Sequence, residues 1–173
     1  MGYSLILPER VYWPAASLDE ATDNPAFASL TGSNQDLSTA NFVDSGTTYA
    51  RLHHRLPDDW YPAGAIDVRL QWITPATSGN VVWTVETAYR AEGGVGTLDP
   101  AFNTAATVTT AAPGTANRLV MSALLALSKT GAVASSLLFL RIGRDPAAAG
   151  DTIANTARLV GVELTYRRLV VIE

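Results

Sequence analysis

The residues in this sequence that could do chemistry are few and lie far apart. The two histidines, His53 and His54, are adjacent, and neighbouring side chains on a strand point to opposite faces, so the pair cannot hold one metal ion from a regular strand. Asp58-Asp59 follows a proline, which is typical of a turn. A glycosidase needs two carboxylates facing one another across a cleft, and nothing in the sequence pairs these aspartates with Glu163. We expect His54 to be half-buried and His53 to be exposed.

The sequence signatures of common enzymes are missing. The sequence contains no Gly-x-Ser-x-Gly, Gly-x-x-x-x-Gly-Lys or His-Glu-x-x-His motif. It contains no cysteine, which excludes disulfides, Cys-ligated zinc and thiol nucleophiles. Asp99, Asp145 and Asp151 lie in separate Gly-containing loops, whereas calcium takes several oxygen ligands from one tight cluster. The sequence therefore predicts a protein that is not an enzyme and that has no cofactor and no metal ion.

The composition points to a role in binding or building. Of the 173 residues, 16% are charged, below the roughly 25% of average soluble chains. A weakly charged exterior favours a surface that is covered by a partner or by copies of the same chain. The net charge is −4 and Lys129 is the sole lysine, so no basic stripe is available to follow a nucleic-acid backbone.

The sequence carries no signal that would take it to or across a membrane. Residues 1–10 lack both a basic region and a long apolar region, so they do not form a secretory signal. The longest apolar stretch, residues 119–127, is too short to span a bilayer. We expect a soluble protein that is made in a cytoplasm and has no membrane partner.

Alternation of apolar and polar residues organises the chain from residue 41 onward. Residues 66–72 place Ile, Val, Leu and Trp on one face and Asp, Arg and Gln on the other, as in a strand with one buried side. A helix over residues 119–127 is an alternative, but the flanking glycine and the regular spacing of the other strands favour a strand. With a short strand at 11–13, we expect strands over residues 49–56, 65–73, 81–89, 104–112, 119–128, 135–143 and 157–171. About eight strands without a long helix predict an all-β fold, an antiparallel two-sheet β-sandwich.

A turn near the middle of the chain predicts how two of these strands pair. Thr77-Ser78-Gly79-Asn80 is a tight-turn sequence, so we expect a hairpin between the strands at 65–73 and 81–89. This pairing would put Trp72 and Trp83 on the inward side of adjacent strands, where the two rings are expected to meet in the core.

The first 40 residues differ from the rest. Pro8, Pro14 and Pro25 interrupt them, and few apolar residues follow a regular pattern. We expect residues 1–40 to form an extended N-terminal arm and residues 41–173 to form the sandwich. Exposed aromatic residues on such a segment are costly unless something covers them, so the arm is expected to dock on a neighbouring subunit or a larger particle by adding a strand to an exposed edge.

Several segments together resemble a known family over residues 50–168. They are Leu56-Pro57-Asp58-Asp59-Trp60, the strand ending in Trp72, Gly79-Asn80-Val81-Val82-Trp83, residues 141–145 and residues 161–166. The combination resembles the jelly-roll structural proteins of tailed-bacteriophage virions, which include capsid decoration (cement) proteins and tail or collar appendages. The resemblance implies a β-sandwich, usually trimeric, that attaches to a virion surface by arms and loops and has no active site.

Two functions of different classes remain open. The first is a capsid decoration protein of the virion, a homotrimer that stabilises the phage head by binding the major capsid protein or another virion protein. The second is a carbohydrate- or receptor-binding sandwich of a tail fibre or collar, with Trp13, Trp60 and Tyr61 as stacking platforms. The candidate interface residues are Tyr12, Trp13, Phe27, Trp60 and Tyr61. Exposure of Trp60 to solvent in the assembled particle would separate the two functions.

Overall fold

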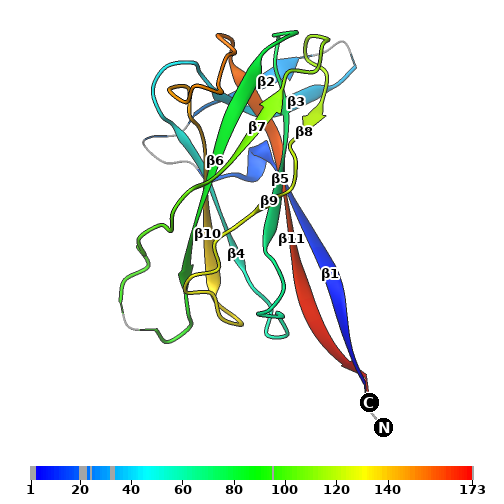
Figure 1. Cartoon of the computed structure of the whole chain (residues 1–173), viewed down its shortest axis with the longest axis vertical. Helices are drawn as coiled ribbons and strands as arrows, with labels where there is room; N and C mark the ends of the chain where they lie inside the picture. Colours follow the sequence, from blue (N-terminus) through cyan, green and yellow to red (C-terminus); the bar gives the residue numbers. More distant parts are fainter. Residues whose placement is uncertain (1–2, 20–22, 24, 32–33, 95, 173) are drawn as a thin grey trace.

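Two antiparallel β-sheets packed face to face form the body of the protein (Figure 1). The computed structural model describes residues 3–19, 23, 25–31, 34–94 and 96–172. Within these ranges there is no α-helix, and the 3₁₀ turn η1 (Ala15–Ser17) follows the first strand. The predicted all-β, antiparallel two-sheet sandwich is confirmed, and the arrangement is jelly-roll-like.

The two sheets differ in size. Sheet A runs in the order β2-β3-β11-β5-β8, with β1 pairing with β11 and β9 pairing with β5. Its strands are β1 (Tyr3–Pro14), β2 (Ala26–Thr31), β3 (Asp36–Phe42), β5 (Asp67–Ile73), β8 (Val120–Met121), β9 (Leu125–Ala126) and β11 (Ala157–Ile172). Sheet B runs in the order β4-β10-β6-β7, made of β4 (Tyr49–Arg55), β10 (Leu137–Arg144), β6 (Asn80–Arg90) and β7 (Ala106–Ala111).

The strands predicted from residue 49 onward are confirmed. Most of them begin and end within two residues of the predicted ranges, because alternation with one buried face is a strong signal over seven or more residues. The segment at 119–128 is extended and forms the two short strands β8 and β9, which pair with β5. The helix considered for this segment does not form.

The core lies between the sheets and centres on two tryptophans. Trp72 from sheet A and Trp83 from sheet B are fully buried, and their ring centroids are 5.9 Å apart at an interplanar angle of 70°. Phe42 adds a second edge-to-face contact with Trp83 at 5.2 Å. Aromatic pairs of this geometry contribute beyond the area that they bury. The prediction that the two tryptophans meet in the core is confirmed.

The predicted hairpin between these strands is wrong. β5 belongs to sheet A and β6 to sheet B, so residues 74–79 cross from one sheet to the other instead of joining neighbouring strands. Six residues easily span the separation of about 10 Å between packed sheets. Alternation shows which side chains face inward, but it is the same for a strand in either sheet. The turn sequence does not distinguish a hairpin within one sheet from a connection between two sheets.

The predicted boundary at residue 40 is not found either. β1 pairs with β11 along its whole length, from Tyr3 opposite Ile172 to Pro14 opposite Gly161. Ala15, Leu18 and Ala40 are buried in the core, and β2 and β3 form a hairpin at the edge of sheet A. Beyond residue 8, the described residues of the first 40 are therefore part of the sandwich, and the expected boundary at residue 40 is corrected.

The two tryptophans yield a stability prediction. Trp83→Ala would leave a cavity against Trp72 and Phe42, so we expect a loss of about 3–5 kcal/mol in the free energy of unfolding, measured by chemical denaturation. Leu98→Ala, at a residue that is 73% exposed, is the matched control and should change the stability by less than about 0.5 kcal/mol. A Trp83→Ala protein that unfolds at the same denaturant concentration as the parent would show that the core is assigned incorrectly.

Candidate functional site

The residues predicted to form an interface are not all on the surface. Trp60 is only 4% exposed and belongs to the core of the chain itself. Trp60 is therefore wrong as an interface residue or a glycan platform, because its side chain is buried within the core of the chain. Trp13 and Phe27 are half-buried and pack against the core, and Tyr61 is half-buried too.

Tyr12 is the exposed member of the predicted set, and its ring has a structural role. The side chain lies over Gly161 of β11, where an added Cβ would come within 2.2 Å of the Tyr12 hydroxyl. Glycine is needed at this position because the ring occupies the space of any side chain. The contact fixes the register of β1 on β11.

The two histidines lie as the sequence predicts. His53 is exposed and its Nδ1 lies 3.0 Å from a carboxylate oxygen of Asp19. His54 is half-buried between Trp13, at a centroid distance of 5.2 Å, and Tyr166, whose hydroxyl lies 3.3 Å from Nε2. Burial lowers the pKa of His54, and the negative charge of Glu9 opposes this shift.

Arginines hold one of the two adjacent aspartates and several other carboxylates of the chain. Arg168 donates from Nε and Nη2 to Asp59, at 2.8 and 2.7 Å, and this contact lowers the pKa of Asp59. Its neighbour Asp58 accepts a hydrogen bond from Ser135. Other pairs include Asp23 with Arg51, Glu86 with Arg141, and Asp151 with Arg144. The two adjacent aspartates thus act in separate local contacts.

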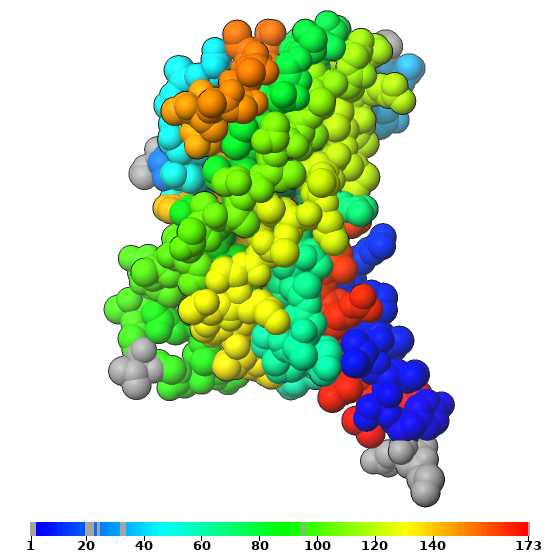
Figure 2. All heavy atoms as spheres, viewed as in Figure 1, coloured from blue at the N-terminus to red at the C-terminus, as the bar shows by residue number. Residues whose placement is uncertain are grey.

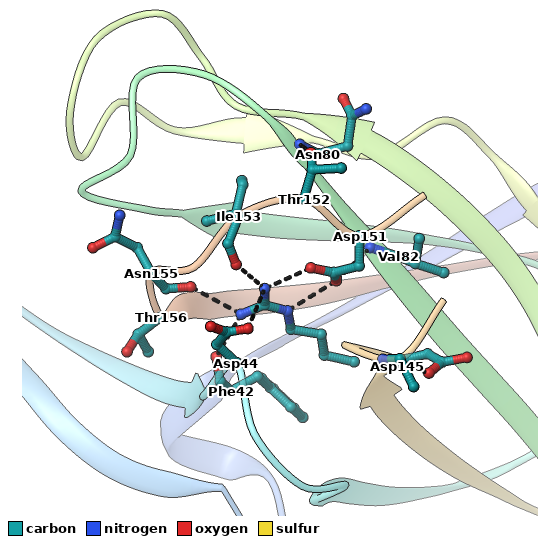
Figure 3. A network of polar contacts seen from close by, with 12 residues as sticks. Phe42, Asp44, Asn80, Val82, Asp145, Asp151, Thr152, Ile153, Asn155 and Thr156 are labelled. Carbon is teal, nitrogen blue, oxygen red and sulfur yellow. Dashed lines mark hydrogen bonds and ion pairs between the residues drawn. The ribbon is translucent and has the colours of Figure 1, made fainter. Parts of the chain in front are cut away.

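Arg144 is the centre of the most buried polar network (Figure 3). Its side chain is 1% exposed, and Nε and Nη2 donate to the two carboxylate oxygens of Asp151 at 2.9 and 2.6 Å. Nη1 donates to the carbonyl oxygens of Asn155 at 2.8 Å and of Phe42 at 3.5 Å, and Nη2 donates also to that of Ile153. Each of the five guanidinium N–H groups therefore has an acceptor.

This network connects four parts of the fold. It joins the end of β10 to the end of β3 and to residues 151–155, and the backbone N–H of Val82 on β6 donates to Asp151 at 3.0 Å. Both carboxylate oxygens of Asp151 are thus already accepting hydrogen bonds. In the part of the chain that the structure describes, no three or more His, Cys, Asp or Glu side chains form a group that could hold a metal ion. The network is structural.

The most exposed feature is a two-stranded projection at the chain ends. The pairing of β5 with β11 ends at Thr165, whereas β1 and β11 continue together to Tyr3 and Ile172. We call residues 3–8 and 167–172 the terminal ribbon. Figure 1 shows it leaving the body as a narrow extension with both chain ends at its tip, and Figure 2 shows the same projection in atomic detail.

Apolar side chains are concentrated on the terminal ribbon. Seven of the fifteen exposed large hydrophobic residues of the described chain lie there: Tyr3, Leu5, Ile6, Leu7, Leu169, Val171 and Ile172. Directly opposed residues share a face, and the register assigns one face to Tyr3, Leu5, Leu7, Val170 and Ile172, with Arg168 at its root. The other face carries Ser4, Ile6, Leu169 and Val171, with Pro8 and Arg167 at its root. Toward the tip, both faces of the ribbon are therefore mainly apolar.

The ribbon is held firmly at its root. Besides the Arg168–Asp59 ion pair, the N–H of Tyr61 donates to the carbonyl of Arg167 at 2.9 Å, and the N–H of Leu169 donates to that of Asp59 at 2.7 Å. Residues 59–61 thus act as a short third strand at the start of the ribbon. The Leu56-Pro57-Asp58-Asp59-Trp60 motif lies at this root. Trp60 packs in the core, and Asp59 binds Arg168 of the ribbon.

The accessible surface reflects this projection. It measures 8991 Å², whereas a compact monomer of this mass exposes about 8,100 Å². The excess is about 800 Å², the area that each partner contributes to a standard protein–protein interface.

None of the described segments is a helix long and apolar enough to cross a membrane.

Comparison with known proteins identifies no family for this chain. No family model matches the sequence, and no curated protein matches it. Among solved structures, an exo-β-1,3-galactanase from Phanerochaete chrysosporium with galactose is similar, at 12% sequence identity and a TM-score of 0.46. The similarity covers 90% of this chain and 29% of the galactanase chain. The function therefore has to be argued from the residues of this chain.

The Arg144 network predicts a large effect of one substitution. Arg144→Met would leave Asp151 buried without its cation, so we expect the free energy of unfolding to fall by about 3–5 kcal/mol in denaturant titration. Adding Asp151→Leu should restore part of that loss, because no charge then stays buried. Arg118→Met, at an exposed arginine, is the control. An Arg144→Met protein as stable as this control would contradict the structural role.

The position of His54 predicts a dependence of stability on pH. Because burial lowers its pKa in the folded state, the unfolded chain, with a pKa of about 6.5, takes up a proton that the folded chain does not. The stability should therefore fall as the pH is lowered through about 6.5, and level off below the folded pKa. We expect His54→Gln to flatten this part of the profile of melting temperature against pH, and His53→Gln to preserve it. An identical slope in His54→Gln would refute the assignment.

Proposed function

We propose that this chain is a structural virion protein, a decoration protein that binds the surface of a phage head as an oligomer. The observation that carries the proposal is the terminal ribbon, whose apolar side chains lie uncovered on both faces. The likeness of residues 50–168 to jelly-roll virion proteins supports the same assignment, as does the charged fraction of only 16%.

The ribbon supports an assembly role because it is poorly suited to water. A two-stranded ribbon without a covered face is marginally stable by itself. Val171 is 64% exposed and Tyr3 is 59% exposed, and exposed apolar patches of this kind mark surfaces that bind other proteins. We infer that the working form of the protein covers the ribbon.

The rigid root makes the ribbon suitable for attachment. Asp59, Tyr61 and the adjoining strands fix its direction relative to the sandwich. An interface segment that is already ordered loses little conformational entropy when it binds. The sandwich itself contributes a rigid body, since the core and the Arg144 network tie both sheets together.

The proposal is tested by locating the protein in particles. Phage particles are induced from the organism that encodes the chain, purified on a density gradient, and analysed by quantitative mass spectrometry. We expect the protein to co-purify with the heads in a fixed ratio to the major shell protein, and heads without it to break at lower temperature. Recovery only in the particle-free fraction would overturn the proposal, and recovery only with isolated tails would overturn the head location.

A further inference from the structure

Toward its tip, the terminal ribbon has two unpaired edges. Arg167 accepts a hydrogen bond from Tyr61, and Leu169 donates one to Asp59, so both direct their backbone groups away from β1. In an antiparallel pair, the β1 residues opposite Arg167 and Leu169 then direct their backbone groups away from β11, toward the other edge of the ribbon. These β1 residues are Pro8 and Ile6. By the same two-residue period, the outward backbone groups near the tip belong to Ser4 and Ile6 on β1 and to Val171 on β11.

The two prolines of β1 protect only part of its edge. Pro8 and Pro14 both stand at outward positions, where their missing N–H costs no bond to β11 and prevents a further strand from pairing. Toward the tip no proline or charged residue interrupts residues 3–7. In the described chain no strand pairs with this stretch or with the opposite edge at Val171. The tip thus offers two open edges beside apolar side chains.

We propose that the terminal ribbons of neighbouring copies pair edge to edge, β1 of one copy with β11 of the next. β1 runs from the tip toward the body and β11 runs back to the tip. When ribbons lie side by side and point the same way, these two strands are therefore antiparallel. Each copy uses its β1 edge for one neighbour and its β11 edge for the other, so the contact is heterologous. Such a contact forms a ring where the rotation between copies closes, and the ring is the arrangement that leaves no edge open.

The closed ring contains three copies of this chain. Two ribbons supply four strands, too few to enclose side chains, whereas three supply six and leave no edge open. One face of every ribbon would point inward, and the face with Tyr3, Leu5, Leu7, Val170 and Ile172 is the more apolar one. Each copy makes two contacts in the ring, so the excess surface of about 800 Å² per copy is divided between two interfaces.

This inference deepens the proposed function by naming the partner of the ribbon as the protein itself. Two other occupants are distinguishable. A strand from a shell protein would leave the purified chain monomeric. Isologous pairing of β1 with β1 would give a dimer in which the edge at Val171 stays open.

The first test removes one outward N–H. Ile6→Pro deletes the edge donor without removing a bond from the β1–β11 ladder, and Ile6→Ala keeps the donor but loses the side chain. By light scattering we expect the parent to have three times the 18.3 kDa mass of the chain. The Ile6→Pro trimer should dissociate at a protein concentration at least 100-fold higher than that at which the Ile6→Ala trimer dissociates. A parent that is monomeric at every concentration, or equal dissociation of the two variants, would overturn the ring.

The second test identifies which edges meet. The chain has no cysteine, so Ile6→Cys and Val171→Cys can be made separately, given tags of different mass, mixed and oxidised. The ring predicts disulfides between the two variants and few within either one. Links within Ile6→Cys alone would show pairing of β1 with β1 and contradict the ring. A monomer that still binds heads would refute only the ring, whereas a trimer absent from particles would refute only the proposed function.

Discussion

The structure depends on the pairing of one long strand. β11 spans sixteen residues and pairs with β3 and then β1 along one edge, and with β5 along the other. Its first half supplies Leu159, Val162 and Leu164 to the core. Its second half leaves the sandwich and becomes half of the terminal ribbon. The same hydrogen-bonded ladder therefore holds the core and positions the surface that we propose for assembly.

Two interactions make the body rigid enough for this role. The contact of Trp72 with Trp83 joins the sheets through apolar burial, and Arg144 joins their ends through hydrogen bonds. A buried ion pair gains little net free energy over an apolar pair of the same volume, but it requires one arrangement of its partners. In this fold it fixes residues 151–155 against β3 and β6. The ribbon, by contrast, has no such cover within the chain.

Much of the fold could be predicted from the sequence, because alternation identifies strands and the inward position of Trp72 and Trp83. The sheet to which each strand belongs could not be predicted from the sequence, because the pattern around Gly79 suits a hairpin as well as a connection between the two sheets. Of β1, only residues 11–13 could be predicted as a strand, because Pro8 and Pro14 interrupt the pattern. These prolines block an edge that only the paired structure reveals. Trp60 could not be assigned to the core because its motif lies in a turn. The apolar residues of the ribbon are ordinary strand residues by sequence, and only the end of β5 pairing at Thr165 shows that they are uncovered.

In the working protein, the edges of the terminal ribbon should be covered. Hydrogen exchange of individual backbone amides measures this cover, because the amides of Ile6 and Val171 point outward while those of Leu5 and Val170 lie within the ladder. We expect all four amides to be protected in the concentrated protein, and Ile6 and Val171 to lose their protection first on dilution. Fast exchange of Ile6 and Val171 at every concentration, with Leu5 and Val170 still protected, would contradict it.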